Sequence, residues 1–330
     1  MELGAIFAPT VDTPAHIELA ERLGYRYAFV YDSPTFLADP WMVLAQAART
    51  TSQVVLGVSV LTPRMRHLAA TAGAVATLRA MAPGRVAMVL GTGFTSQLMV
   101  GKRPAPWAEV EAYLVALRRL LAGEEIEWDR AVIGLCHGRL TGMAEGGEVP
   151  LWMAAHGPKG YAVAARVADG VVTHLTHGAR NALGEQAEHA FVLFYGTVLD
   201  PGEDLDSERV VEAAGPTAAF QLHLGGEGIA GGTPEWREYE AAVADIDERR
   251  RHLEVHGGHL IEVSELERPL ITPELIATTT ESGTPEHVRE RVGALAASGV
   301  RGALFGPQGG DVARELRAFV AAVGLTGPVS

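Results

Sequence analysis

The chain alternates short uncharged runs rich in β-branched residues with longer amphipathic runs, and this alternation restricts its fold more than any other feature. Eight short runs fit strands: Leu3–Ala8, Tyr27–Tyr31, Val54–Val60, Val86–Leu90, Leu151–Ala154, Gly170–Thr173, Phe191–Val198 and Gly302–Phe305. Six longer runs fit helices: Pro14–Leu23, Trp41–Thr50, His67–Met81, Trp107–Leu121, Gly160–Val167 and Val312–Val323. Strands without charges are buried on both faces, which is typical of a parallel sheet covered by helices.

Eight such strands favour a closed (β/α)8 barrel, a TIM barrel, over an open doubly wound sheet. The open sheet stays the alternative because the last two strands carry the weakest pattern. Length alone suggests about two domains of roughly 150 residues. No change in composition marks a linker, so we expect a single domain, residues 1–330, with two insertions. Residues 124–140 have a hairpin pattern, and residues 225–282 hold a charged helical run at 235–251 followed by an irregular stretch.

Composition excludes several classes of protein. The 40 acidic residues outnumber the 27 basic ones, for a net charge of −13, and no basic cluster predicts nucleic-acid binding. No uncharged apolar stretch reaches about 18 residues, so no membrane-spanning helix is expected. The lone Cys136 and the lack of a signal-peptide pattern favour the cytoplasm. Aromatic residues make up only 6%, which predicts a core of Ala, Val and Leu and makes aromatics near strand ends candidates for a pocket.

Two glycine-containing segments follow predicted strands, at the end of a parallel barrel where active sites lie. In GTGFTS (Gly91–Ser96), bare backbone N–H groups can approach phosphate oxygens. HGPKG (His156–Gly160) opens a helix, whose first N–H groups favour an anion. Together they indicate a phosphorylated ligand, although each loop could simply turn the chain. Neither has the pattern of a Walker loop or a Rossmann fingerprint.

Asp32 and His174 also follow predicted strands. A carboxylate directly after a buried strand is unfavourable unless it is used, so Asp32 is either functional or a cap of the turn beside Pro34. His174 either faces a substrate or lies on a surface loop.

Three histidines, His252, His256 and His259, have the spacing of one helical face. Gly257 and Gly258 interrupt that helix before the third histidine, and no carboxylate completes a recognisable ligand set. We therefore expect no metal site.

Four segments resemble the bacterial luciferase-like superfamily, most closely its branch that uses the deazaflavin F420. They are LGVSVLTPRMRHLAATAGAVATL, RVAMVLGTG, PLWMAAHGPKGYAVAARVADGVV and GTPEHVRERVGALAASGVRGALFGPQGG, and they occur in the order that the superfamily has. The resemblance implies a TIM barrel that binds F420, or alternatively FMN, at the carboxyl ends of its strands. It also implies a cis peptide bond between Ser59 and Val60, behind the ring of the cofactor.

The resemblance extends to individual residues. The implied cofactor-binding residues are Asp32, Ser59, Val60, Leu61, Gly91, Thr92, Gly93, Thr95, Ser96, His156, Gly157 and Pro158. The sugar-phosphate dehydrogenases of this branch carry an Asp-His pair after the second strand and a glutamate after the GTG loop, where this chain has Asp32-Ser33 and Phe94. Sugar-phosphate oxidation is therefore not expected. Asp32 and Ser33 remain the candidate catalytic residues.

The substrate pocket is expected to include Phe94, His174 and Trp41, although Trp41 suits the core equally well. The favoured function is an F420-dependent oxidoreductase, working as a reductase that transfers hydride from reduced F420 to an activated C=C or C=N bond of a small organic substrate. An FMN-dependent monooxygenase using O2 and a non-catalytic flavin-binding relative are the alternatives. A homodimer and a separate reductase that supplies reduced cofactor are further expectations.

Overall fold

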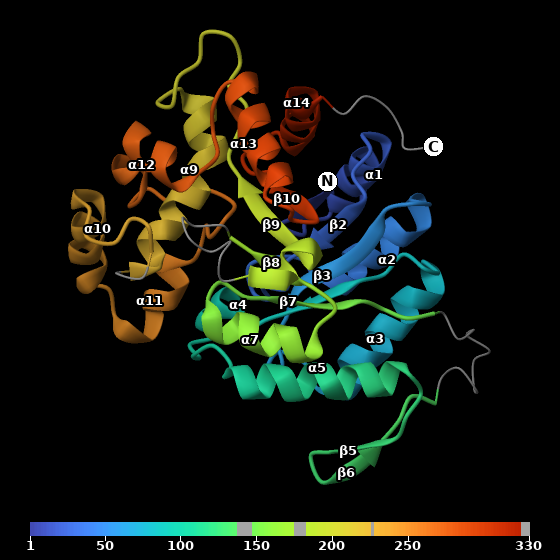
Figure 1. The fold of residues 1–330 in the computed structure, drawn as a ribbon. Helices are drawn as coiled ribbons and strands as arrows, with labels where there is room; N and C mark the ends of the chain where they lie inside the picture. Colours follow the sequence, from blue (N-terminus) through green and yellow to red (C-terminus); the bar gives the residue numbers. More distant parts are fainter. Residues whose placement is uncertain (137–146, 175–182, 226–227, 325–330) are drawn as a thin grey trace.

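A closed barrel of parallel strands forms the centre of the computed structural model, which describes residues 1–136, 147–174, 183–225 and 228–324 (Figure 1). Within these ranges, the eight barrel strands are β1 (Glu2–Phe7), β2 (Tyr27–Val30), β3 (Val55–Leu61), β4 (Met88–Leu90), β7 (Leu151–Ala154), β8 (Val171–Thr173), β9 (Ala190–Tyr195) and β10 (Gly302–Gly306). The register pairs Gly4 of β1 with both Tyr27 of β2 and Leu304 of β10, which closes the barrel. The predicted (β/α)8 fold is confirmed, and the open sheet is excluded.

Most helices of the first half cover the barrel as the sequence predicts. They are α1 (Thr13–Arg22), α2 (Pro40–Thr50), α3 (Leu68–Met81), α5 (Trp107–Leu121) and α7 (Pro158–Val167), with α14 (Val312–Val323) next to α1; the short α4 (Phe94–Leu98) was not predicted. Asp39 shows why α2 begins where it does, because its carboxylate accepts hydrogen bonds from the backbone N–H groups of Trp41 and Met42. No helix in the described ranges combines the length and apolar character needed to cross a membrane.

The second half is more helical than the sequence predicts. Its elements are η1 (Gly184–His189), α9 (Glu208–His223), α10 (Pro234–Ala244), α11 (Glu248–Val255), η3 (Arg268–Leu270), α12 (Pro273–Thr279) and α13 (Pro285–Ala297). The single charged helix expected at 235–251 is two helices, because Asp247 caps a new helix at Arg249. The stretch expected to be irregular contains α12. Figure 1 shows α9 to α12 gathered on one side of the barrel, away from α1 to α3.

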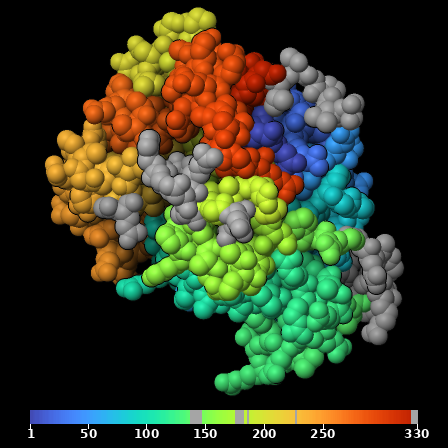
Figure 2. Space-filling model, in the orientation of Figure 1, coloured from blue at the N-terminus to red at the C-terminus, as the bar shows by residue number. Residues whose placement is uncertain are grey.

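The smaller insertion is the predicted hairpin, formed by β5 (Ile126–Trp128) and β6 (Ala131–Ile133) in antiparallel pairing. It projects from the body of the molecule in Figures 1 and 2. Residues 137–140 of the first expected insertion and residues 226–227 of the second lie outside the described residues.

The inside of the barrel corrects the expectation of an aliphatic core. Aromatic side chains of β2, β7 and β9 fill its amino-terminal end, where the rings of Trp152 and Phe191 stack with centroids 4.8 Å apart. The Arg301 guanidinium lies 5.7 Å from the Trp152 ring and 5.5 Å from the Phe191 ring. Its Nε is 2.8 Å from the Glu2 carboxylate, which balances its charge. The few aromatic residues of the chain therefore serve the core as well as the pocket.

Candidate functional site

A cavity of about 1250 Å³ opens at the carboxyl ends of the barrel strands. Its walls come from residues in the carboxyl-terminal parts of β3, β7 and β9, from residues that follow β2, β4, β7 and β8, and from the helical second half. The cavity therefore lies where the fold places active sites.

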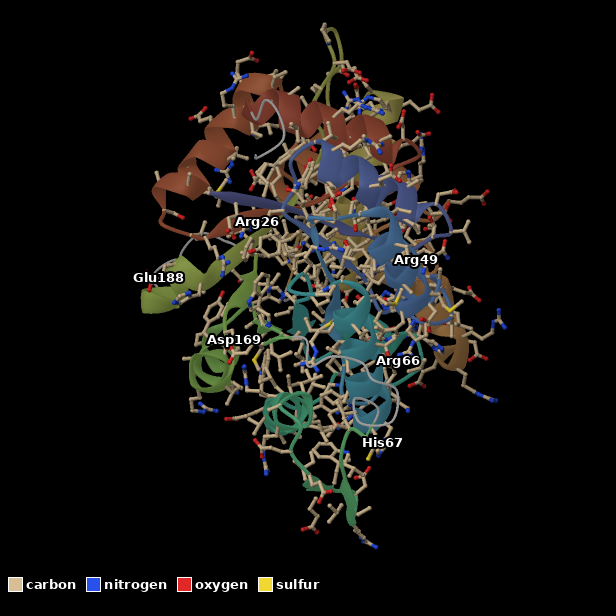
Figure 3. The ribbon with its side chains drawn as sticks, turned by 90° about the vertical axis from the view of Figure 1, so that its right-hand side faces the viewer. Arg26, Arg49, Arg66, His67, Asp169 and Glu188 are labelled. Carbon is tan, nitrogen blue, oxygen red and sulfur yellow. The ribbon has the colours of Figure 1, made fainter. Side chains whose placement is uncertain are left out.

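Asp32 and Ser33 line the cavity directly after β2, and they are 5% and 8% exposed. Burial raises the pKa of the Asp32 carboxyl, although the nearby Arg66 partly opposes this effect. The Arg66 Nε lies 3.8 Å from the Asp32 carboxylate; Figure 3 labels Arg66 in the segment before α3. In the part of the chain that the structure describes, the Asp32 side chain accepts no hydrogen bond from the turn that follows. Its turn-capping interpretation therefore has no support in the geometry.

The peptide bond between Ser59 and Val60 is cis, and the register between β3 and β4 shifts at this point. Both residues line the cavity, and the Val60 side chain packs beside Gly91. Gly93 has a φ of +73°, and a Cβ on it would lie 2.3 Å from the Thr62 Oγ1. Only glycine fits this turn without displacing its neighbours, so the loop presents bare backbone to the cavity.

Aromatic and imidazole rings form the wall over β7, β8 and β9. The His174 ring lies 4.9 Å from the His156 ring and 5.7 Å from the Tyr195 ring. The Tyr195 hydroxyl lies 3.1 Å from that of Tyr31, next to Asp32. Although His156 is open to the cavity, the surrounding protein screens it from bulk water, and this desolvation lowers its pKa to about 4. Desolvation, together with His156, lowers the pKa of His174 to about 3, so both rings are neutral at pH 7.

The opposite wall is apolar near α4 and α9, and charged near α13. Phe94 is 36% exposed, and its ring meets the Phe220 ring edge-on, with centroids 6.4 Å apart. Glu281 and Arg291 form an ion pair that also borders the cavity. The cavity thus combines a polar wall, formed by backbone and hydroxyl groups of the glycine loop, with an apolar wall around Phe94 and Phe220.

The structure gathers most of the residues singled out from the sequence around this cavity. Those that line it are Asp32, Ser33, Ser59, Val60, Gly91, Thr92, Gly93, Phe94, Thr95, Ser96, His156 and His174. Four others do not line it: Leu61 is buried in the core, Gly157 and Pro158 begin α7 beside it, and Trp41 packs on the outer core. For Trp41 the core interpretation matches its position, and its pocket role is corrected.

Sequence reasoning missed Tyr31, Tyr195, Phe220 and Arg291, which also line the cavity. The two tyrosines end strands, and this position could have identified them. Phe220 and Arg291 lie on α9 and α13, which were not predicted as helices.

Comparison with known proteins gives consistent results. The family model of the luciferase-like monooxygenases matches residues 8–191. A 5,10-methylenetetrahydromethanopterin reductase of Archaeoglobus fulgidus is 24% identical over 96% of this chain and 97% of its own length. An F420-dependent glucose-6-phosphate dehydrogenase of Beutenbergia cavernae is 34% identical over 50% of this chain and 53% of its own length. The match thus spans about half the length of this second relative.

Among solved structures, the coenzyme F420 dependent tetrahydromethanopterin reductase from Methanopyrus kandleri superimposes with a TM-score of 0.73. It is 20% identical, with 98% of each chain covered, so the likeness concerns the fold. The family model spans more than half of the 330 residues, and the fold agrees with it. This chain belongs to the luciferase-like monooxygenase family.

Proposed function

We propose that this chain is an F420-dependent oxidoreductase that works as a reductase on an apolar organic substrate. The observation that carries the proposal is the cavity at the carboxyl ends of the strands, which brings the Ser59–Val60 bend and the Gly91–Ser96 loop to one polar wall. The relative named as an F420-dependent glucose-6-phosphate dehydrogenase supports the choice of cofactor.

The polar wall fits a phosphate-bearing cofactor. A Cβ on Gly93 would clash with the Thr62 and Ser96 side chains, so the tight turn of this cavity-lining loop requires glycine. The Ser96 hydroxyl lies 3.2 Å from that of Thr62 and so belongs to a hydroxyl-rich patch at the same turn. His156 and His174 are neutral and add no positive charge. Anion binding here therefore relies on N–H and O–H donors.

When bound, F420 supplies a hydride from its deazaflavin ring, and the chain supplies position and a proton. Val60, packed against Gly91, offers a firm apolar surface for the ring to rest on. Asp32 is the group proposed to supply the proton, because its carboxyl lines the cavity and burial raises its pKa above the ordinary value. Ser33 lies beside it as a hydrogen-bond donor.

The apolar wall indicates the substrate class. Phe94 stands where the related sugar-phosphate dehydrogenases have a glutamate, and it packs with Phe220 instead of offering a charge. A substrate with an activated C=C or C=N bond and an apolar body fits between this wall and the cofactor ring.

Titration of the protein with F420 and with FMN, followed by fluorescence, tests the proposal. We expect saturable binding of F420, with FMN at least tenfold weaker. Tight binding of FMN without binding of F420 would overturn the proposal and favour the monooxygenase alternative. Tight binding of F420 without turnover of any unsaturated acceptor would favour a non-catalytic relative.

A further inference from the structure

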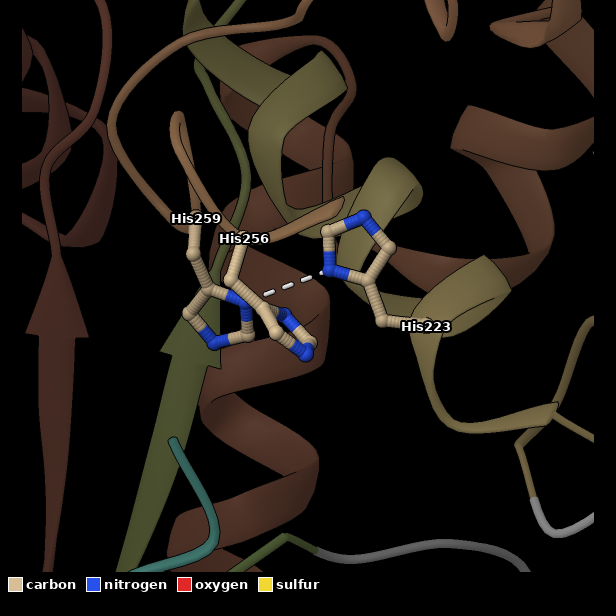
Figure 4. A group of neighbouring side chains, drawn as sticks. All are labelled: His223, His256 and His259. Carbon is tan, nitrogen blue, oxygen red and sulfur yellow. Dashed lines mark hydrogen bonds between the residues drawn. The ribbon is translucent and has the colours of Figure 1, made fainter. Parts of the chain in front are cut away.

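Three imidazoles converge at the edge of the cavity, at the junction between α9 and the insertion, and one of them, His259, also lines the cavity. His223 ends α9, His256 caps α11, and His259 follows in the next turn. Their ring centroids form a nearly equilateral triangle, with distances of 5.0, 5.3 and 5.4 Å (Figure 4). His252, which has the right spacing in the sequence, is not part of this group, and His223 takes its place.

The nitrogen atoms of this triangle are close enough to share one ion. One ring nitrogen from each histidine lies within 4.8 Å of the other two. The Nδ1 atoms of His223 and His259 are 3.2 Å apart. A tetrahedral zinc ion with Zn–N bonds of about 2.0–2.1 Å needs nitrogen atoms roughly 3.3 Å apart. The closest pair therefore already has the spacing of two ligands.

A buried carboxylate orients one of the rings. Glu267 accepts a hydrogen bond from the His223 Nε2, and both side chains are almost completely buried. The backbone N–H and hydroxyl of Ser264 hold the second oxygen of Glu267. A carboxylate on the far nitrogen of a histidine is the usual partner of a metal ligand, because it fixes the ring and leaves the other nitrogen free to bind.

Hydrogen bonds do not satisfy all the ring nitrogen atoms of the three histidines. Thr95 can donate to the His259 Nε2, His259 can donate through Nδ1 to the His223 Nδ1, and His223 can donate to Glu267. His256 is 6% exposed, and its Nδ1 has no hydrogen-bond partner among the described residues. A shared metal ion would satisfy this third ring together with the other two.

We propose that His223, His256 and His259 bind one divalent transition-metal ion of the zinc type, with Glu267 as the orienting carboxylate. Three imidazole side chains form a ligand set that suits zinc and leaves one position for water. The ion would tie the end of α9 to the segment after α11. Because His259 also contacts Thr95 on α4, the ion would hold α4 in place beside the cavity. The proposal concerns structure and does not depend on the identity of the cofactor.

The test uses the untagged protein, treated with a chelator and dialysed. Titration with Co²⁺, followed by visible absorption, should show the bands of a tetrahedral or five-coordinate nitrogen site that saturate at one ion per chain. Zn²⁺ should displace the Co²⁺, and it should raise the thermal unfolding midpoint until one equivalent is bound.

Variants locate the ion. His256→Ala should lower the Co²⁺ affinity at least tenfold, while His252→Ala, one helical turn away and outside the triangle, should leave it unchanged. Glu267→Gln should weaken binding by about 10–100-fold while retaining all three imidazoles. If His256→Ala does not fold, the Co²⁺ spectrum of the unmodified protein still tests whether the metal site exists. The proposal is wrong if that protein shows no ligand-field bands, or if His252→Ala weakens binding as much as Glu267→Gln does.

Discussion

The two ends of the barrel are built from opposite kinds of residue. The amino-terminal end is filled by stacked Trp152 and Phe191 rings under the guanidinium of Arg301. The carboxyl-terminal end is hollow and carries Gly93, His156 and hydroxyl groups around a cavity. The difference teaches that this chain stabilises one end of its barrel and leaves the other free for ligands. Substitutions at the two ends should therefore separate stability from binding.

Trp152→Ala should have the largest effect, because it empties the packed end. Trp152 is 2% exposed and contacts aromatic rings of β2 and β9. We expect a loss of about 3–5 kcal/mol in the free energy of unfolding, measured by urea denaturation. Phe94→Ala at the hollow end is the control and should cost less than about 1 kcal/mol, since Phe94 is 36% exposed. Equal losses in the free energy of unfolding would mean that the two ends contribute equally to stability.

Asp32→Asn should act on catalysis and not on the fold. The change keeps the shape of the side chain but removes the proton-holding carboxyl. Under the proposed function we expect turnover at saturating F420 to fall about hundredfold, which corresponds to about 2.7 kcal/mol. Asp129→Asn on the exposed hairpin is the matched control. Unaltered turnover in the Asp32 variant would remove this residue from the mechanism.

Gly93→Asp should weaken F420 binding about tenfold, because its Cβ displaces Thr62 and Ser96 and it adds a negative charge to the loop expected to bind the cofactor phosphate. Gly84→Asp is a matched control. Gly84 has a φ of +71°, close to the +73° of Gly93, but a Cβ there meets nothing within 4 Å. The fluorescence titration described above measures both variants. If the two lose affinity equally, the loss comes from backbone strain and not from the cavity.

The pH dependence of stability tests how deeply the hollow end buries His174. Unfolded His174 takes up a proton near its ordinary pKa of 6.5, whereas the folded side chain does so only near 3. Between these values the unfolded state binds more protons, so the free energy of unfolding falls as the pH drops below 6.5. Thermal melts of the cofactor-free protein from pH 7.5 to 4.5 should show a shallower fall for His174→Gln. A fall as steep as in the parent protein would place the His174 ring in contact with bulk water.

The sequence predicts the first half of the molecule well, because there each strand, turn and helix carries its own local signal. Asp32 and the Gly91–Ser96 loop could be placed near one another as soon as their strands were recognised. The second half was harder to predict. Pro216 lies inside α9, and Gly215 precedes it, a pair that argues against a helix. Position 215 requires glycine because a Cβ there would lie 2.7 Å from a methyl group of Val263 in the insertion.

The histidine triangle illustrates a second kind of limit. Spacing along the chain groups His256 with His252. The fold instead brings His256 next to His223, although α10 and α11 separate these two residues in the sequence. Residue spacing in a single sequence predicts contacts within one helix or strand, and it does not predict a contact between segments this far apart.

The pairing of β1 with β10 bears on how the protein is made. Glu2 pairs with Gly302, so β1 finds this neighbour only after all the barrel strands between them in the sequence have been synthesised. Until then β1 presents an open edge, the kind of surface through which nascent chains associate wrongly. The ion pair between Glu2 and Arg301 joins the same two strands, and so it forms only once the barrel closes.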